Sequence, residues 1–215
     1  MKLKEKIKNI HYALYSFLNT YIQSLDKTKY GKCGKNVVFQ PPIMVTKPQN
    51  VYLGDNVNIF GNAQLIVSTN GRFIMKKNSG AAQGLTVVTG NHTVKPTIGV
   101  WHKEVIQDSS TDRDTDIIVE EDVWIAANVT LLPGAIIGRG AIVGAGSVCR
   151  NFVPPYSIVM GNPAKVVSFK YTPNEIIEHE RNLYPEQERL SLEYLEKNYQ
   201  KYYLKRIKQI IEFIK

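Results

Sequence analysis

A six-residue period of apolar positions runs through the middle of the chain. Five large aliphatic residues are spaced by six, and the residue four places after each is small or β-branched; the two sets are Val119, Ile125, Leu131, Ile137 and Val143, and Val123, Val129, Ala135, Ala141 and Ser147. Six matches neither the 3.6-residue period of an α-helix nor the alternation of a simple strand. The period is typical of a solenoid in which each hexad forms one short strand, with its aliphatic side chain inward, and a tight turn.

Glycines and an earlier stretch extend this pattern. Four glycines lie at or near the predicted turns, where backbone freedom is needed: Gly134, Gly138, Gly140 and Gly146. The same phase appears upstream, with aliphatic residues and smaller residues at Leu53, Ile59 and Leu65, and at Val57, Ala63 and Thr69. The stretch TNGRF and a polar excursion over residues 93–116 interrupt it. We therefore predict five or six triangular coils between about residues 35 and 165, stacked about 4.8 Å apart as neighbouring strands are.

Both ends of the chain are expected to be helical. Residues 3–25 carry an apolar stripe at helical spacing, and Thr172, Pro173 and Glu175 form the start and capping box of a second helical region that Pro185 interrupts. Solenoids need covered ends, so both helical regions are expected over the ends or sides of the coils. The predicted organisation is an N-terminal helix over 1–30, a mainly β domain over 31–170 and C-terminal helices over 171–215.

Composition narrows the class of protein. The chain has 215 residues, 43% of them hydrophobic, which is enough to bury a core, and it has no run of 18 apolar residues that would span a bilayer. Charges interrupt the N-terminus where a signal peptide needs an apolar run, so we expect a cytoplasmic protein without stable membrane insertion.

Lysines and arginines that contribute to the net charge of +8 cluster in the two terminal helices, which favours solvated helix faces over a nucleic-acid site. Cys33 and Cys149 lack disulfide or metal spacing, and Cys149 is expected to be a small buried side chain.

One histidine stands in an unusual place, the turn of VVTGNHTVKP at residues 87–96. Pro96 stops a helix there, and histidine is the side chain whose unperturbed pKa lies near neutrality, so His92 could serve as a base. A loop histidine that only bonds its own turn is the commoner case. The excursion that follows contains four aspartates that could tune a histidine or form a solvated charge run, namely Asp108, Asp112, Asp114 and Asp116.

The run VWIAANVTLLPGAIIGRGAIVGAGSVCRNFVPPYSIVMGNPAKVV resembles the hexapeptide-repeat acyltransferases. In particular it is similar to the branch that holds maltose and galactoside O-acetyltransferases, xenobiotic acetyltransferases and polysaccharide O-acetyltransferases. The resemblance covers about residues 35–170, and it implies a left-handed parallel β-helix. It also implies acetyl-CoA as co-substrate without a metal, and a homotrimer with sites at the subunit interfaces. The expected reaction is O-acetylation of a saccharide or surface-glycan precursor.

The resemblance assigns roles to individual residues. His92, in the matching TGNH position, would be the general base of a ternary-complex mechanism. Ala127 would offer its N–H to the acyl carbonyl oxygen and Ala145 would hold the pantetheine amide. Trp124 would wall that cleft, with a place in the core as the equal alternative. The phosphates of coenzyme A would meet two cations at the end of the coils, Arg150 and Lys165.

Acceptor residues are less well marked. Relatives use an asparagine one coil earlier, and Asn62 stands beside the matching position; Trp101 and His102 lie in the excursion that walls the acceptor pocket in the resembling enzymes. This chain reads Arg150-Asn151 where relatives often read Thr-Lys, so its cation is expected one residue away from the position of theirs.

Several alternatives stay open. An N-acetyltransferase acting on a nucleotide-linked amino sugar and a xenobiotic acetyltransferase would use the same fold and base. A non-enzymatic β-helix scaffold would need neither the turn histidine nor cations at the end of the coils. A carbonic anhydrase of the same fold needs three imidazoles on one zinc, and only His92 and His102 lie in the repeat region. A serine acetyltransferase needs a larger helical N-terminal domain than about 30 residues.

Overall fold

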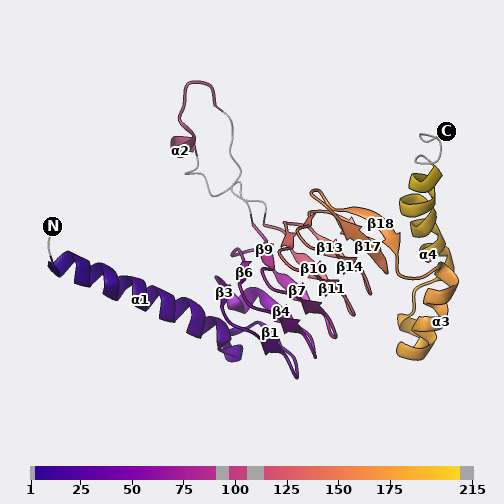
Figure 1. Cartoon of the computed structure of the whole chain (residues 1–215), viewed down its shortest axis with the longest axis horizontal. Helices are drawn as coiled ribbons and strands as arrows, with labels where there is room; N and C mark the ends of the chain where they lie inside the picture. The colour runs from indigo at the N-terminus through magenta and orange to yellow at the C-terminus, as the bar shows by residue number, and fades with distance from the viewer. Residues whose placement is uncertain (1–2, 91–96, 106–113, 209–215) are drawn as a thin grey trace.

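Three parallel sheets wrap around one core as a β-helix of about six turns (Figure 1). The computed structural model describes residues 3–90, 97–105 and 114–208. The first sheet contains β1 (Lys32–Cys33), β4 (Val51–Leu53), β7 (Phe73–Met75), β10 (Ile117–Val119), β13 (Ile136–Ile137) and β16 (Phe152–Val153). The second contains β2 (Val38–Phe39), β5 (Asn58–Ile59), β8 (Gly80–Ala81), β11 (Trp124–Ile125), β14 (Ile142–Val143), β17 (Ser157–Met160) and the antiparallel β18 (Lys165–Phe169). The third contains β3 (Ile43–Val45), β6 (Ala63–Ile66), β9 (Thr86–Val88), β12 (Thr130–Leu131) and β15 (Val148–Cys149). The predicted mainly β solenoid is confirmed.

The coils differ in length although the strands keep their register. Ile118 pairs with Ile136, which is the 18-residue coil that three hexads predict. The coil from Tyr52 to Ile74 has 22 residues, and the next one, from Ile74 to Ile118, has 44. The long coil contains the polar excursion, so the excursion is an insertion between two strands that remain in place.

The core contains the positions that the period selects. All five aliphatic residues of the central repeat are fully buried, and the small residues four places later are buried as well. Thr69 is the exception, because it is exposed. Its coil has four residues more than three hexads, and Val67 takes the inward position instead.

Left-handed backbone conformations form the corners between the sheets. Gly134, Gly140 and Gly146 have φ values of +82°, +66° and +69°. Gly138 serves differently, since a Cβ there would lie 2.6 Å from the backbone nitrogen of Pro155. One corner column begins with three left-handed asparagines whose side chains form a ladder: Asn36 Nδ2 donates to Asn56 Oδ1 at 3.1 Å, and Asn56 Nδ2 donates to Asn78 Oδ1 at 2.9 Å. Asparagine tolerates this conformation better than other side chains, so it replaces glycine there.

The N-terminal helix does not cover the end of the β-helix, contrary to expectation. Helix α1 (Leu3–Leu25) extends away from the sheets, and only its C-terminal end packs against β3 (Figure 1). There the backbone N–H of Val45 donates to Ser24 Oγ at 3.0 Å, and the hydroxyl of Tyr30 donates to the Ser24 carbonyl oxygen at 2.6 Å. A short helix, η1 (Lys27–Lys29), leads into β1. No helix in the described ranges is both long enough and apolar enough to cross a membrane.

Helices at the other end fulfil the expectation of a cover. They are α3 (Pro173–Leu183), η4 (Glu186–Glu188), α4 (Leu192–Tyr199) and the π-helix η5 (Gln200–Leu204). The capping box of Thr172 and Glu175 is present at the start of α3. Among the described residues, the remaining short helices are η2 (Pro48–Asn50) and α2 (His102–Val105).

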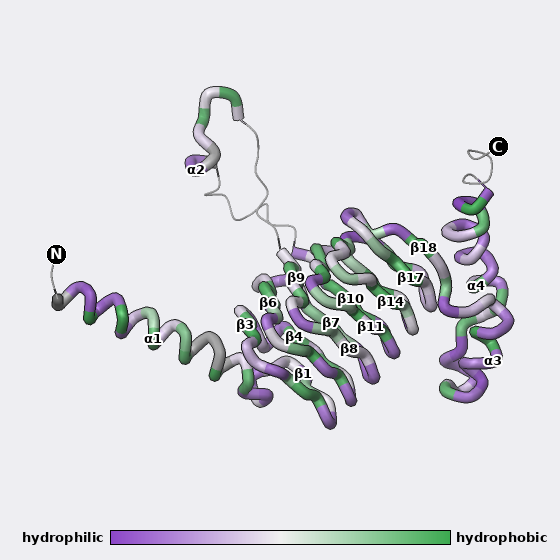
Figure 2. Tube along the Cα trace, viewed as in Figure 1, coloured by the Kyte–Doolittle hydropathy of each residue, from purple (hydrophilic) through white to green (hydrophobic). Residues whose placement is uncertain are grey.

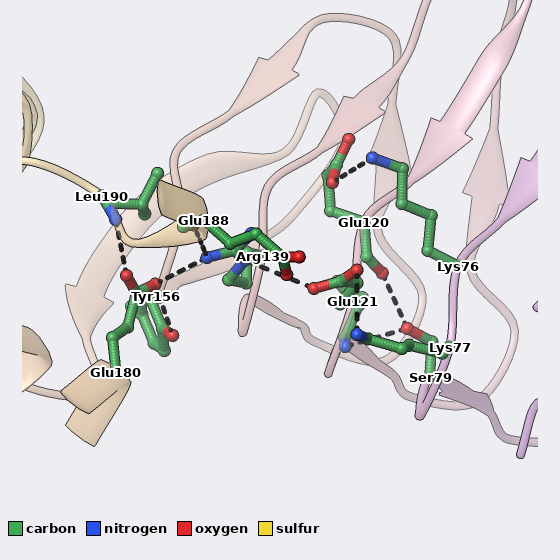
Figure 3. Close-up of polar contacts among 11 residues, drawn as sticks. Lys76, Lys77, Ser79, Glu120, Glu121, Arg139, Tyr156, Glu180, Glu188 and Leu190 are labelled. Atoms are coloured by element: carbon green, nitrogen blue, oxygen red, sulfur yellow. Dashed lines mark hydrogen bonds and ion pairs between the residues drawn. The ribbon is translucent and has the colours of Figure 1, made fainter. Parts of the chain in front are cut away.

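A buried polar network attaches α3 to a corner of the β-helix (Figure 3). Glu180, fully buried, accepts hydrogen bonds from Arg139 at 3.1 Å, from the Tyr156 hydroxyl at 2.9 Å and from the backbone N–H of Leu190 at 2.6 Å. Burial, together with the Glu180 carboxylate, raises the pKa of Tyr156, so its hydroxyl stays a donor. Tyr156 occupies the left-handed position that asparagine or glycine fills in most other coils, with a φ of +58°. Its ring lies over Gly140, where a Cβ would approach it to 2.5 Å.

Candidate active site

The loop that contains His92 leaves the β-helix at a point where hydrogen bonds hold its two ends together. Thr115 N–H donates to the Thr89 carbonyl oxygen at 2.9 Å, and the backbone N–H of Ser68, in the coil before, donates to Thr89 Oγ1 at 2.8 Å. Gly90 fits between these strands because it has no side chain: a Cβ would lie 2.5 Å from Asp114 Oδ1 and 2.6 Å from Ser68 Cβ. The two ends of the loop are therefore held together directly before His92.

Two acidic residues of the excursion help to hold the two ends of this loop together. Asp114 Oδ2 accepts a hydrogen bond from the backbone N–H of Asn70 at 3.0 Å. Asp116 accepts from the backbone N–H of Arg72 at 2.8 Å and from the Arg72 guanidinium at 3.0 and 2.5 Å. This hydrogen-bonded ion pair lowers the pKa of Asp116. Both side chains thus close the loop, and neither forms a merely solvated charge run. Asp108 and Asp112 lie outside the described residues.

The predicted base and part of the predicted acceptor pocket are not described. His92 lies outside the described residues, as does the side chain of His102, although the backbone of His102 begins α2. Trp101, just before α2, is 79% exposed. The roles of these three residues therefore stay predictions.

The predicted pantetheine contacts lie together on the corner between the second and third sheets. Ala127 follows β11 and Ala145 follows β14, and these strands pair directly. The backbone N–H of Gly146 donates to the Ala127 carbonyl oxygen at 2.9 Å, which stacks one alanine on the other. Within the described part of the chain, the N–H groups of both alanines have no hydrogen-bond partner. Two backbone donors on successive coils are therefore available to a ligand.

Trp124 stands beside this corner and faces outward. It is 45% exposed, so the alternative of a core tryptophan is wrong. Its ring lies over Gly80 in the coil before, where a Cβ would come within 3.0 Å of the ring. A flat aromatic surface therefore borders the Ala127 corner, as a wall of the predicted cleft would.

Asn62 lies on the same corner, two coils before Ala127. The corner residues on successive coils are linked by hydrogen bonds of 2.9 Å, from Gly84 N–H to the Gly61 carbonyl oxygen and from Asn128 N–H to the Gln83 carbonyl oxygen. Asn62 is exposed and left-handed, with a φ of +60°. Its identity thus has a backbone reason, and its predicted acceptor role remains untested.

A cationic pocket of about 440 Å³ lies at the C-terminal end of the β-helix. Its apolar wall includes Val153 and Val159, and its cations are Lys165, Lys201 and Arg206. The Arg206 guanidinium donates to the Val166 carbonyl oxygen, which fixes it next to Lys165 on β18. Arg150 is exposed and does not line the pocket. The predicted pair of Arg150 and Lys165 is therefore not brought together here.

Lys201 and Arg206 were expected only on a solvated helix face. Five residues separate them, and an α-helix would place them on different sides. Lys201 lies in the π-helix η5, in which the Lys205 N–H donates to the Gln200 carbonyl oxygen, and Arg206 follows two residues after its end. The wider turn between them lets both side chains line one pocket. No pattern in the sequence announces a π-helix, although the run of basic residues could have suggested an anion site.

No group of three histidine, cysteine or acidic side chains that could hold a metal occurs among the described residues. Cys149 is buried, as expected, and burial raises the pKa of its thiol to about 11.

Comparisons with known proteins agree with this architecture. Residues 116–151 match the family model described as bacterial transferase hexapeptide (six repeats). A protein of Escherichia coli K12 named as a colanic acid biosynthesis acetyltransferase, WcaF, is 31% identical over 136 residues, which are 63% of this chain and 68% of that protein. A protein of Saccharomyces cerevisiae named as an acetyltransferase is 26% identical over 137 residues, covering 64% of this chain and 65%, just under two thirds, of its own length.

A solved structure shows the same fold with a ligand. It is the hexapeptide-repeat acetyltransferase of Vibrio cholerae in complex with acetyl coenzyme A, with a TM-score of 0.60 and 25% identity over 69% of this chain and 76% of that one. The inward hexads, the stacked corner and these relatives lead to one conclusion. The chain belongs to the hexapeptide-repeat acyltransferase family.

Proposed function

We propose that the chain transfers an acetyl group from acetyl-CoA to a hydroxyl of a saccharide or surface-glycan precursor. The observation that carries the proposal is the corner of Ala127 and Ala145, with two stacked backbone donors that have no partner in the described residues and the Trp124 ring beside them. An extended amide such as pantetheine needs donors of this kind on successive coils. The name of the E. coli relative, which refers to colanic acid biosynthesis, supports a glycan acceptor.

The reaction follows from the groups available. His92 takes the proton of the acceptor hydroxyl, and the oxygen attacks the thioester carbonyl carbon. The Ala127 N–H stabilises the oxyanion of the tetrahedral intermediate. The carbon–sulfur bond then breaks, and the imidazolium returns its proton to the sulfur, so that free coenzyme A and the acetyl ester leave. No acyl-enzyme is needed, because both substrates are bound at once.

The cationic pocket supplies the proposed phosphate contacts. Lys165 keeps its predicted role, and Lys201 and Arg206 join it because they line the same pocket. Guanidinium and ammonium groups are the usual partners of phosphates. Arg150 is exposed outside the pocket, so it is expected to contribute less than these three residues to binding the phosphates of coenzyme A. Since acetyl-CoA is the donor, we place the reaction in the cytoplasm.

The position of the two half-sites supports a homotrimer. The His92 loop leaves the corner between the third and first sheets, after β9, whereas Ala127 lies on the corner between the second and third sheets. The whole third sheet separates them on one chain. Packing copies side by side brings the His92 corner of one against the Ala127 corner of the next, and three copies close the ring.

The proposal is tested with His92→Ala and, as a matched control, His11→Ala on the exposed helix α1. Thiol release from acetyl-CoA is followed with a panel of sugars. Loss of a positioned general base should lower the rate by about 10² to 10⁴, and His11→Ala should act like the wild type. Equal turnover of the His92 variant and wild type would remove His92 from the mechanism.

The products distinguish the alternatives. A labelled acetyl ester of a sugar supports the proposal, whereas a labelled amide of an amino sugar or an acetylated antibiotic would assign the chain to another acceptor class. No labelled product, together with no binding of coenzyme A by calorimetry, would indicate a scaffold.

A further inference from the structure

Helix α1 presents apolar side chains that nothing in the described chain covers. Ile7, Ile10 and Leu14 are 57%, 67% and 55% exposed on a helix that projects away from the sheets (Figure 1). Figure 2 shows hydrophobic turns recurring along this helix. A row of large aliphatic side chains on an isolated rod is unfavourable in water, so it indicates an interaction surface.

The spacing of this row identifies the kind of partner. Ile7, Ile10, Leu14 and Phe17 follow one another at intervals of three, four and three, and in the sequence Leu3 and Tyr21 continue the alternation at both ends. This is the a and d pattern of a coiled-coil seam, sustained for nearly three heptads. Leu18 and Leu25, both exposed, stand one place after the d positions and widen the seam, as bundles of more than two helices require. Isoleucine at both a and d also favours three or more strands.

The place where α1 joins the β-helix agrees with a threefold partner. Its last turn packs on β3, in the third sheet, through the bond from Val45 N–H to Ser24 Oγ. The third sheet lies between the two corners that are proposed to meet across the subunit interface. In that arrangement the third sheets of all copies face the threefold axis, and each α1 starts beside it.

We propose that α1 binds the α1 helices of two further copies of this chain, in a parallel three-stranded coiled coil on the axis of the trimer. The proposal rests on the trimer of the proposed function. Threefold symmetry requires the helices to be parallel and in register, so Ile10 meets Ile10. The coil raises the effective concentration of the β-helices for one another and keeps the interface sites assembled at low protein concentration.

The test uses the full chain with single cysteines in a Cys33→Ala background, where Cys149 is buried. Ile10→Cys lies in the seam, and Tyr12→Cys, two residues later and 73% exposed, lies on the opposite face as the matched control. Mild oxidation should link Ile10→Cys subunits covalently and leave Tyr12→Cys subunits separate. In a second measurement, Ile10→Asp should raise the concentration at which half of the trimer dissociates at least tenfold, with no such shift for Tyr12→Asp.

The outcomes separate this inference from the proposed function. Equal cross-linking of both cysteines, with a trimer that Ile10→Asp does not weaken, would overturn the coiled coil and leave the shared site standing. A fully active wild-type monomer would overturn the trimer itself. Binding of α1 to vesicles of anionic phospholipid that Ile10→Asp abolishes, without cross-linking, would assign the apolar face to a lipid surface and refute the coiled coil.

Discussion

Glu180→Gln is the sharpest test of how the C-terminal helices are held. The side chain is fully buried and accepts from three donors, on Arg139, Tyr156 and Leu190 (Figure 3). Glutamine keeps the size and one acceptor but removes the charge. The Arg139 side chain, only 14% exposed, then loses its hydrogen-bonded counter-ion.

The expected cost follows from this burial. Breaking a buried ion pair by removing one partner costs about 3 to 5 kcal/mol. Arg139 keeps a second carboxylate, with its Nε 3.6 Å from Glu121 Oε2, and its guanidinium lies over the Tyr184 ring. These contacts favour the lower end, about 3 kcal/mol. For a chain of this size each kcal/mol lowers the melting temperature by about 2 to 4 °C, so a fall of about 6 to 12 °C is expected.

Thermal unfolding followed by circular dichroism measures this fall. Glu178→Gln, on an exposed position of the same helix, is the matched control and should change stability by less than about 0.5 kcal/mol. The double variant Arg139→Met with Glu180→Gln should recover part of the loss, because neither charge is then buried alone and the glutamine oxygen remains as an acceptor for Tyr156 or Leu190. A Glu180→Gln protein as stable as the control would refute the ion pair as the anchor of α3.

Three further predictions concern the site. Lys165→Ala or Arg206→Ala should weaken coenzyme A binding in calorimetry at least tenfold, and Arg150→Ala should do so less, because only the first two line the pocket. Gly90→Ala should lower the turnover number at least tenfold with an unchanged circular dichroism spectrum, since its Cβ would collide with Asp114 at the loop base. Arg72 lowers the pKa of Asp116, so the stability that this carboxylate contributes is present above the unfolded pKa of about 3.9 and is lost as the pH falls through the folded value. The difference in urea midpoint between wild type and Asp116→Asn should therefore be constant near neutrality and vanish in acid.

The repeat was predictable because the inward positions obey one rule in the 18-residue coils of the central repeat. If the aliphatic residue of a hexad stood at another position, the coil would bury a polar group or expose an apolar one. The five aliphatic residues from Val119 to Val143 therefore keep their spacing of six, and all of them are buried. The corners were only partly predictable. Glycine in a sequence indicates a left-handed turn, but Asn56 and Asn78 adopt the same positive φ. Tyr156 adopts it too, at a steric cost that its buried hydrogen bond to Glu180 offsets.

The site was less predictable than the fold because it depends on features without a period. The stacking of Ala127 and Ala145 follows from the 18-residue coil, which the six-residue period of the sequence predicts. The grouping of Lys165 with Lys201 and Arg206 depends on an antiparallel strand and a π-helix, and neither follows from the repeat. The pairing of α3 with the Arg139 corner depends on one ion pair between residues far apart in the sequence.

The long excursion explains how such a rigid β-helix can carry a variable site. Phe73 and Ile117 pair in register although 44 residues separate them, so the insertion leaves the stack of strands intact. The bonds at Thr89, Asp114 and Asp116 close the loop where it leaves the corner. Closing a longer loop costs only about 0.6 kcal/mol for each doubling of its length. The residues between Gly90 and Asp114 can therefore change without disturbing the stack, while the Ala127 corner, proposed to bind the donor, keeps the spacing that the core imposes on it.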